Sequence, residues 1–371
     1  MKNIPYGRQS IDADDISAVS EALQSDFLTT GPRVAEFEKS LCSFTGASHA
    51  IAVNSGTSAL DIAVGALGFP AGSEIITTPF TFAASANCAL YNGCKPVFAD
   101  INPHTLNIDP AQVEKKITKK TKAIVCVDYA GQPCQMGELS ELAKKHGLVL
   151  IEDAAHSLGA KYNGKKVGTL ADLTTFSFHP VKHITTGEGG AVATQDEGLA
   201  AKLRMLRNHG IDKAPSERQG YLYDMKMLGK NYRITDFQCA LGVSQMKKLP
   251  QFLSRRREIA KLYEKELSSA GGVSTPTVLP NVLHAYHLFP VLLDEPKIRD
   301  RVFESMRKKG IGVNVHYIPV YKFSYYQKLG YADLQCRSAE SAYARLLTLP
   351  MHFGITAQDV HHICKCLIES F

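Results

Sequence analysis

Lys182 is the residue in this chain best placed to do covalent chemistry. It follows a segment in which Leu173, Phe176 and Phe178 indicate a short strand, and it precedes a turn of three glycines and one acid at residues 187–190. Burial lowers the pKa of a lysine, and a free amine attacks an aldehyde to form a Schiff base. A lone lysine beside a glycine-rich turn is usually a surface residue. The interpretation of Lys182 as a Schiff-base lysine therefore depends on residues upstream.

An acid and a histidine follow a second apolar run. Residues 148–151 are all apolar, which is typical of a strand covered on both faces in a parallel α/β sheet, and Gly147 is suited to end the preceding helix. Such a strand delivers Asp153 at its carboxyl end, where open α/β sheets bind ligands. A buried aspartate there could pair with the protonated nitrogen of a pyridine ring, although a helix-capping role explains a single Asp equally well.

Small polar residues stand between a strand and a helix further upstream. Residues 51–53 are apolar, and residues 60–67 carry apolar side chains at helical spacing, with Gly56 and Thr57 between the two segments. Free N–H groups and the helix dipole at such an N-terminus favour phosphate, but small hydroxyl residues also occur there as plain caps. Phe82, beyond this helix, could stack on a flat cofactor.

Composition and charge narrow the class of protein. The chain has 371 residues, 44% hydrophobic and 21% charged, with a net charge of +6. Its densest basic run, residues 255–257, lies among apolar residues at helical spacing, so a solvated helix face explains it better than nucleic-acid binding does. The first residues contain no apolar signal segment, and no run approaches the roughly 18 apolar residues of a membrane span. We expect a cytoplasmic protein without a membrane or nucleic-acid partner.

The cysteines and histidines do not predict a metal site. Nine cysteines include no CxxC pair, and several, such as Cys126, stand in apolar runs. We expect reduced, buried cysteines that act as small hydrophobic residues, and the thirteen histidines show no zinc spacing.

The elements that must position these residues alternate over most of the chain. After an N-terminal helix carrying Ile16, Val19 and Leu23, strands and helices alternate from about residue 33 to residue 245, which predicts a large, mixed, mostly parallel sheet. Residues 1–245 are therefore assigned to an N-terminal segment and a large domain.

The remaining residues, 246–371, predict a linking helix and a smaller C-terminal α/β domain. We expect the helix at Leu249–Leu267, then a strand near 286–293, a helix near 297–309 and a strand at 313–317, where apolar and polar residues alternate.

Along the chain, a possible phosphate site at Gly56 and Thr57 is followed by the aromatic Phe82, the acid Asp153 and then Lys182. This order resembles that of the pyridoxal-phosphate (PLP) aminotransferases of the DegT/DnrJ/StrS family, which act on sugar nucleotides. The resemblance spans nearly the whole chain and implies the aspartate aminotransferase-like fold of type I PLP-dependent transferases. Its motifs are residues 54–60, 152–156, 177–179 with Lys182, 187–190, 229–233 with Gln238, and 315–317.

The resemblance assigns catalytic roles to three residues. Lys182 would form the Schiff base with PLP and then shuttle a proton between the cofactor and the substrate carbon. Asp153 would keep the ring nitrogen protonated, which makes the ring an electron sink. His156 would lie near the phenolic oxygen of the ring or near the substrate.

It also implies how the cofactor is held. Phe82 would stack on the ring, and Gly56, Thr57 and Ser177 would hold the phosphate. Asn231 matches a residue that reaches the phosphate of the neighbouring subunit, so the resemblance implies a homodimer with shared active sites.

The resemblance bears on the reaction as well. Some family members carry histidine at the lysine position and are sugar dehydratases, whereas this chain keeps Lys182. We expect transfer of an amine, usually that of glutamate in this family, to a ketone on a nucleotide-linked sugar. A PLP-dependent dehydratase and a regulatory protein that kept the fold are the alternatives.

Several segments look closest to one subgroup, whose members make UDP-4-amino-4,6-dideoxy-N-acetyl-β-L-altrosamine on the route to pseudaminic acid, a sugar of surface and flagellar glycans (flagellin glycosylation). A bacillosamine- or perosamine-type 4-keto sugar is the alternative. If the subgroup holds, the sugar-nucleotide site would be lined by Tyr6, Leu28, Thr29, His316 and Tyr317.

Overall fold

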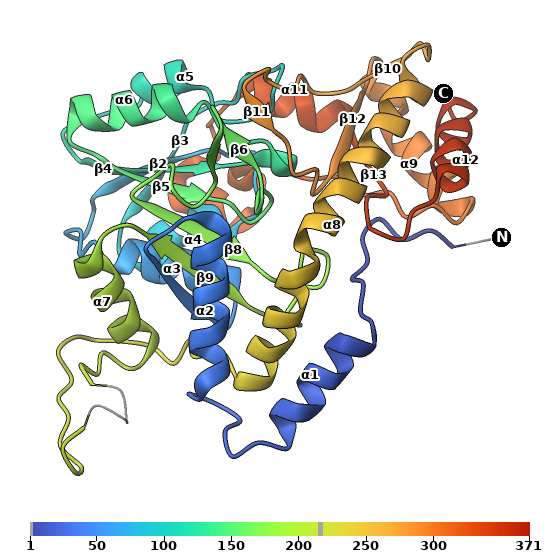
Figure 1. The fold of residues 1–371 in the computed structure, drawn as a ribbon. Coiled ribbons are helices and arrows are strands. Elements are labelled where there is room, and N and C mark those ends of the chain that lie inside the picture. Colours follow the sequence, from blue (N-terminus) through green and yellow to red (C-terminus); the bar gives the residue numbers. More distant parts are fainter. Residues whose placement is uncertain (1–2, 214–217) are drawn as a thin grey trace.

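The computed structural model describes residues 3–213 and 218–371, built around a seven-stranded sheet (Figure 1). Five adjacent strands of this sheet run parallel to one another. The second strand in the spatial order given below is antiparallel to both of its neighbours. The predicted mixed, mostly parallel sheet is thereby confirmed. In spatial order the strands are β1 (His49–Val53), β9 (Gly190–Thr194), β8 (Leu173–Ser177), β5 (Val149–Asp153), β4 (Thr121–Val127), β2 (Glu74–Thr77) and β3 (Lys95–Phe98).

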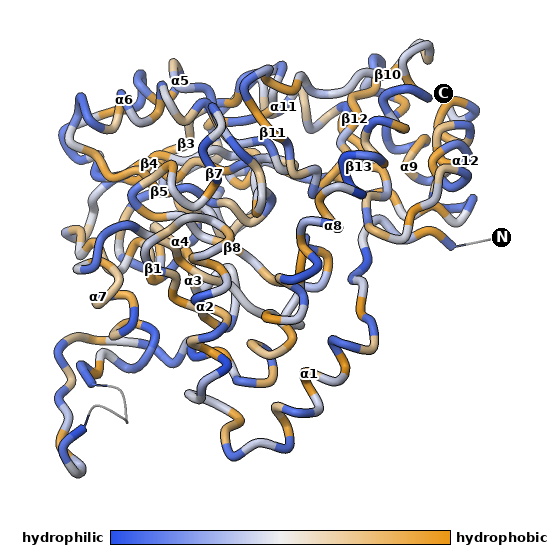
Figure 2. The backbone as a smooth tube through the Cα atoms, viewed as in Figure 1, coloured by the Kyte–Doolittle hydropathy of each residue, from blue (hydrophilic) through white to orange (hydrophobic). Residues whose placement is uncertain are grey.

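Helices cover both faces of this sheet, so its strands are apolar on both sides, as the hydrophobic stretches along β4 and β5 show (Figure 2). Val125 and Ile151 pack on the side of α3 (Gly56–Gly65), α4 (Ala84–Tyr91) and α7 (Glu197–Arg207). Ile124 and Leu150 point the other way, toward α6 (Met136–His146) and α5 (Pro110–Glu114). Alternate residues thus serve opposite layers.

A long helix, α8 (Asp236–Leu267), runs from the large sheet to the C-terminal part of the chain and packs against α1 (Ala13–Leu23), α2 (Pro32–Thr45) and α12 (Ala357–Ile368) (Figure 1). The predicted start at Leu249 was wrong. The helix begins at Asp236 because Thr235 and Gln238 form a capping box there. Its first turns pack closely on α2, since a side-chain atom added at Gly242 would lie 2.7 Å from the Phe37 ring.

The C-terminal part contains a three-stranded antiparallel sheet of β10 (Val273–Ser274), β12 (Phe289–Leu293) and β13 (Leu346–Leu349). It packs with α12 and α9 (Arg299–Lys308) around a core of its own that also includes Ile259 and Tyr263 of α8. The predicted strand near 286–293 and helix near 297–309 correspond to β12 and α9. The described residues also form β6 (Lys161–Tyr162), β7 (Lys165–Lys166), β11 (Val282–Leu283), α10 (Ser324–Tyr326) and α11 (Arg337–Arg345).

The strand predicted at 313–317 was wrong, because the structure forms only a single bridge there, between Asn314 and Thr348. The backbone carbonyl of His316 accepts a hydrogen bond of 2.6 Å from the Tyr129 hydroxyl, so a side chain occupies the position that a neighbouring strand would take. The boundary proposed at residue 245 falls inside α8, and the division of the chain into two domains stays a prediction.

Candidate active site

A cavity of about 770 Å³ opens at the carboxyl ends of the parallel strands, a volume typical of small-molecule sites. β5 and β8 end on it at Asp153 and Ser177, and α3 begins on it directly after β1. The segment 314–318 lines it from the C-terminal part of the chain. The cavity contains ten of the thirteen predicted site residues: Tyr6, Gly56, Thr57, Phe82, Asp153, His156, Ser177, Lys182, His316 and Tyr317.

Lys182 and Asp153 influence each other's charge within this cavity. Burial lowers the pKa of Lys182 to about 8, the Asp153 carboxylate works against that shift, and the Arg256 guanidinium adds to it. Arg256 is itself buried, where it donates to the backbone carbonyls of Tyr286, His287 and Met351. The lysine is therefore close to the state in which its amine is free at neutral pH.

Asp153 is buried and fixed by two hydrogen bonds. Its Oδ2 accepts from the Ser85 hydroxyl at 2.6 Å, and its Oδ1 accepts from the Ala155 N–H at 3.2 Å. Burial raises the pKa of Asp153, while these hydrogen bonds and the charge of Lys182 lower it. A carboxylate in such a site is suited to a cationic partner, and a protonated pyridine nitrogen provides one. Sequence reasoning missed Ser85, although it lies only three residues after Phe82.

The N-terminus of α3 forms a narrow cradle. Ser55 caps the helix by accepting from the Ser58 N–H at 3.0 Å. A Cβ added at Gly56 would lie 2.8 Å from the Ser177 Cβ, and one added at Gly190 would lie 2.4 Å from the Ser55 carbonyl oxygen. Small residues therefore keep this helix end open toward the cavity, as a phosphate group requires. The cradle and Asp153 together fit PLP.

Phe82 lies at the mouth of the cavity rather than in the core. Its side chain is 62% exposed, and its ring centroid lies 6.4 Å from that of Tyr317. An exposed aromatic ring at this position is consistent with the stacking role that the resemblance implies.

Histidines fill the wall between the large sheet and the C-terminal part. His156 Nε2 lies 3.2 Å from the Tyr317 hydroxyl, and its ring centroid is 4.4 Å from that of His287, a residue that sequence reasoning missed. Within the described residues, Nδ1 of His156 and Nδ1 of His287 have no hydrogen-bond partner. Burial lowers the pKa of both imidazoles well below the usual value, so they are neutral at pH 7. His316, whose pKa burial lowers to about 4, is bonded through Nδ1 to the Thr348 hydroxyl at 2.9 Å.

Three predicted residues lie outside this cavity, on the surface of the molecule. Leu28, Thr29 and Asn231 are all exposed. Thr29 forms a bridge with Thr235, the Leu28 carbonyl accepts from the Asp236 N–H at 3.0 Å, and Asn231 forms a bridge with Asn208. The structure thus places all three residues outside the pocket of the same chain.

The described part of the chain contains no helix long and apolar enough to cross a membrane, and no group of three or more potential metal ligands. All nine cysteines are free, and eight of them are buried, Cys42 being partly exposed.

Comparison with known proteins agrees with this geometry. The sequence pattern of the DegT/DnrJ/EryC1/StrS aminotransferase family matches residues 9–368. The chain belongs to this family. Its predicted fold, that of the aspartate aminotransferase-like PLP enzymes, is confirmed by the solved structures it resembles.

Relatives within the family are similar over their full length. The chain is 43% identical to the UDP-4-amino-4,6-dideoxy-N-acetyl-beta-L-altrosamine transaminase of Campylobacter jejuni strain 81-176, over 99% of this chain and 97% of the relative. Its structure matches Helicobacter pylori PseC, an aminotransferase involved in the biosynthesis of pseudoaminic acid, with a TM-score of 0.95, 38% identity and coverage of 100% and 99%. It also matches the putative sugar aminotransferase Spr1654 of Streptococcus pneumoniae in its PMP form, with a TM-score of 0.95, 28% identity and 99% of both chains covered. This DegT/DnrJ/EryC1/StrS member is a PLP-dependent sugar aminotransferase.

Proposed function

We propose that this enzyme transfers the amino group of glutamate to C4 of a UDP-4-keto-6-deoxy-N-acetylhexosamine and produces UDP-4-amino-4,6-dideoxy-N-acetyl-β-L-altrosamine for pseudaminic acid. The observation that carries the proposal is the 43% identity to the Campylobacter transaminase across 99% of the chain, and the cavity of this chain contains Lys182. We place the reaction in the cytoplasm, where free cysteines persist, and its product in surface and flagellar glycans.

The proposed chemistry depends on the protons at the ring nitrogen of PLP, at Lys182 Nζ and at the substrate carbon. PLP, when bound, supplies an electron sink for the carbon that carries the amine. Asp153 would hold a proton on the ring nitrogen, because its buried carboxylate, whose pKa burial raises, favours a cationic partner. Lys182 Nζ, with a pKa of about 8, can accept a proton from the substrate carbon and return it near neutral pH.

The proposed sugar site is the wall opposite α3. Tyr6 and His316 lie there with ring centroids 5.5 Å apart, and Tyr317 stands beside Phe82. Burial raises the pKa values of Tyr6 and Tyr317, so both hydroxyls stay protonated and can donate hydrogen bonds. Such groups suit the hydroxyl and carbonyl oxygens of a sugar.

We also propose that two copies form a homodimer with shared active sites. Leu28, Thr29 and Asn231 are exposed and lie outside the cavity of their own chain, as expected of residues that act on a second copy. Between α7 and α8, the described residues 208–213 and 218–235 include a part that extends away from the body of the molecule (Figure 1). It exposes large apolar side chains, a mark of interaction surfaces: Tyr221, Leu222, Tyr223, Met225 and Leu228.

The test of the proposed substrate compares two epimeric UDP-4-keto-6-deoxy-N-acetylhexosamines, each incubated with the purified enzyme and glutamate, with products resolved by NMR. Amination of the L-arabino epimer alone is the expected result. Preference for the D-xylo epimer would move the enzyme to a bacillosamine-type pathway. Failure to aminate either epimer would contradict the proposed substrate, and a GDP-linked 4-keto sugar would then test the perosamine-type alternative.

A further inference from the structure

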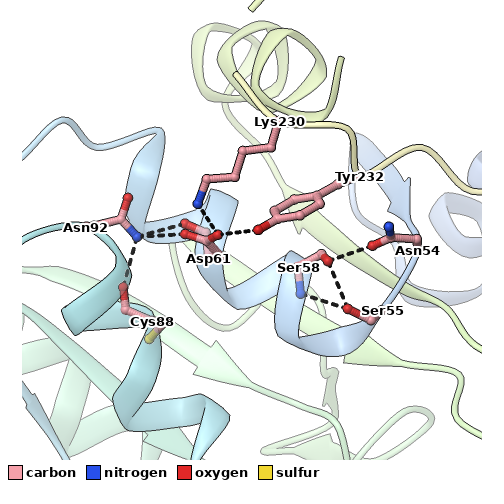
Figure 3. A network of polar contacts seen from close by, with 8 residues as sticks. All are labelled: Asn54, Ser55, Ser58, Asp61, Cys88, Asn92, Lys230 and Tyr232. Carbon is pink, nitrogen blue, oxygen red and sulfur yellow. Dashed lines mark hydrogen bonds and ion pairs between the residues drawn. The ribbon is translucent and has the colours of Figure 1, made fainter. Parts of the chain in front are cut away.

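Asp61, in the middle of α3, is a buried carboxylate that the proposed reaction does not use. Its side chain is 3% exposed, and a carboxylate so deeply buried is tolerated only with good partners. Oδ1 accepts from the Asn92 amide at 3.0 Å, and Oδ2 accepts from the Tyr232 hydroxyl at 2.7 Å and from the Lys230 ammonium (Figure 3). Both oxygens are therefore engaged.

These partners come from segments that carry site residues. α3 itself begins at the cradle residues Gly56 and Thr57. Asn92 ends α4, the helix that contains Ser85, and its amide also donates to the Cys88 carbonyl at 2.9 Å.

The third segment carries Lys230 and Tyr232, the two neighbours of Asn231. Both side chains reach the same carboxylate, as Figure 3 shows, while Asn231 between them is exposed. The carboxylate is thus bonded to the side chains of both neighbours of the asparagine. Burial, followed by the hydrogen bond and charge of Asp61, raises the pKa of Tyr232, so its hydroxyl remains a donor throughout the neutral range.

We infer that Asp61 is a positioning residue: from α3, the helix whose N-terminus forms the phosphate cradle of its own chain, it sets Asn231 for the partner's active site. One carboxylate thereby links the two sites of the dimer. This inference rests on the proposed homodimer, because Asn231 lies outside the cavity of its own chain.

Loss of the carboxylate should leave the fold intact. The backbone of the segment is held independently: the Lys230 N–H donates to the Leu206 carbonyl at 2.8 Å, the Tyr232 N–H to the Arg207 carbonyl at 3.0 Å, and the Tyr232 carbonyl accepts from the Asn54 N–H at 3.0 Å. The Lys230 side chain is 38% exposed, so water can solvate its ammonium when the partner is neutral. Asp61→Asn keeps the size of the side chain, removes its charge and replaces one of its two acceptor oxygens by an NH2 donor.

The first experiment measures the affinity of cofactor-free protein for PLP by the visible absorbance of the lysine-bound cofactor. Asp61→Asn should weaken binding about five- to tenfold, the net scale of one typical hydrogen bond. Glu114→Gln is the matched control, since it neutralises a carboxylate in an exposed pair with Lys145 (2.7 Å) and should change nothing. Addition of Lys230→Met to Asp61→Asn should cause little further loss, because the two side chains act as one contact.

Hybrid dimers separate positioning from a general structural effect. In the first hybrid, a wild-type chain is paired with a chain that carries both Asp61→Asn and Lys182→Ala. Only the site of the wild-type chain retains Lys182; its cradle is intact, and it receives Asn231 from the altered chain. In the second, a chain with Asp61→Asn is paired with a chain carrying Lys182→Ala, so the altered cradle receives a normal Asn231.

The inference predicts weakened PLP binding in the first hybrid and near-normal binding in the second. Weakening confined to the second hybrid, or wild-type affinity in the Asp61→Asn homodimer, would overturn it and leave the proposed function standing. A wild-type protein that takes up no PLP, or that sediments as a monomer while binding it, would instead refute the proposed shared site on which the inference rests.

Discussion

Lys182 and Asp153 show how a single pair of side chains sets the chemistry of the cavity. Burial alone pushes both toward their neutral forms, and each opposes that shift in the other through its charge. The sequence placed both residues correctly on the turn after β8 and at the end of β5. It did not reveal Ser85 or Arg256, because the Ser85–Asp153 contact joins residues 68 positions apart and Arg256 acts from α8. Such long-range partners are determined by packing and leave no local pattern.

The pH dependence of Lys182 follows from this arrangement. In cofactor-free protein, acetylation of Lys182, followed by peptide mass spectrometry, should rise with pH through a midpoint of about 8, since only the free amine reacts. Asp153→Asn should move that midpoint to lower pH, because the carboxylate charge raises the pKa of the lysine. A midpoint near the ordinary lysine value of about 10.4, or an upward move in the variant, would contradict the account.

At the scale of elements, the cradle depends on how closely α3, β8 and β9 approach one another. The apolar runs at 51–53 and 148–151 were sufficient to predict β1 and β5, and the glycines to predict the turn before β9. The strand predicted at 313–317 failed because alternation alone cannot show that Tyr129 would occupy the His316 carbonyl. The start of α8 was missed because small residues, such as Gly242 against Phe37, stabilise its first turns by contact rather than by apolar spacing.

Gly190→Ala tests the cradle directly. The new methyl group would lie 2.4 Å from the Ser55 carbonyl oxygen, so β9 and the start of α3 must separate, at a cost of about 1–3 kcal/mol. We expect a clear loss of PLP affinity by absorbance titration and a lower melting temperature. Gly271→Ala, where an added Cβ meets nothing within 4 Å, is the control and should match the wild type. Equal PLP affinity in the two variants would show that the cradle is not as tight as the structure indicates.

At the scale of the whole molecule, the structure separates the predicted site residues into two places. Ten lie in one cavity formed by both parts of the chain, and three lie outside it and are exposed. The resemblance predicted which residues belong to the site, but the sequence could not show which of them its own chain brings together. That distinction depends on how α8 and the segment before it are arranged around the large sheet.

Leu228→Glu tests whether the exposed apolar segment holds two copies together. Leu228 is 87% exposed, and a buried charge at an interface should raise the dimer dissociation constant at least about tenfold, as measured by analytical ultracentrifugation. Ile368→Glu on α12, where the side chain is 42% exposed, is the control and should leave the assembly unchanged. An unchanged dimer in Leu228→Glu would place the interface elsewhere.

Addition of glutamate alone to the purified, PLP-loaded enzyme tests the central claim, amino transfer at this cavity, most directly. We predict that the visible absorbance of the lysine-bound cofactor is replaced by the near-ultraviolet band of its amine form, with one 2-oxoglutarate released per chain. Lys182→Ala should show neither change. If the visible band persists and no 2-oxoglutarate appears, glutamate is not the donor, and a dehydratase or a regulatory protein would fit the site better.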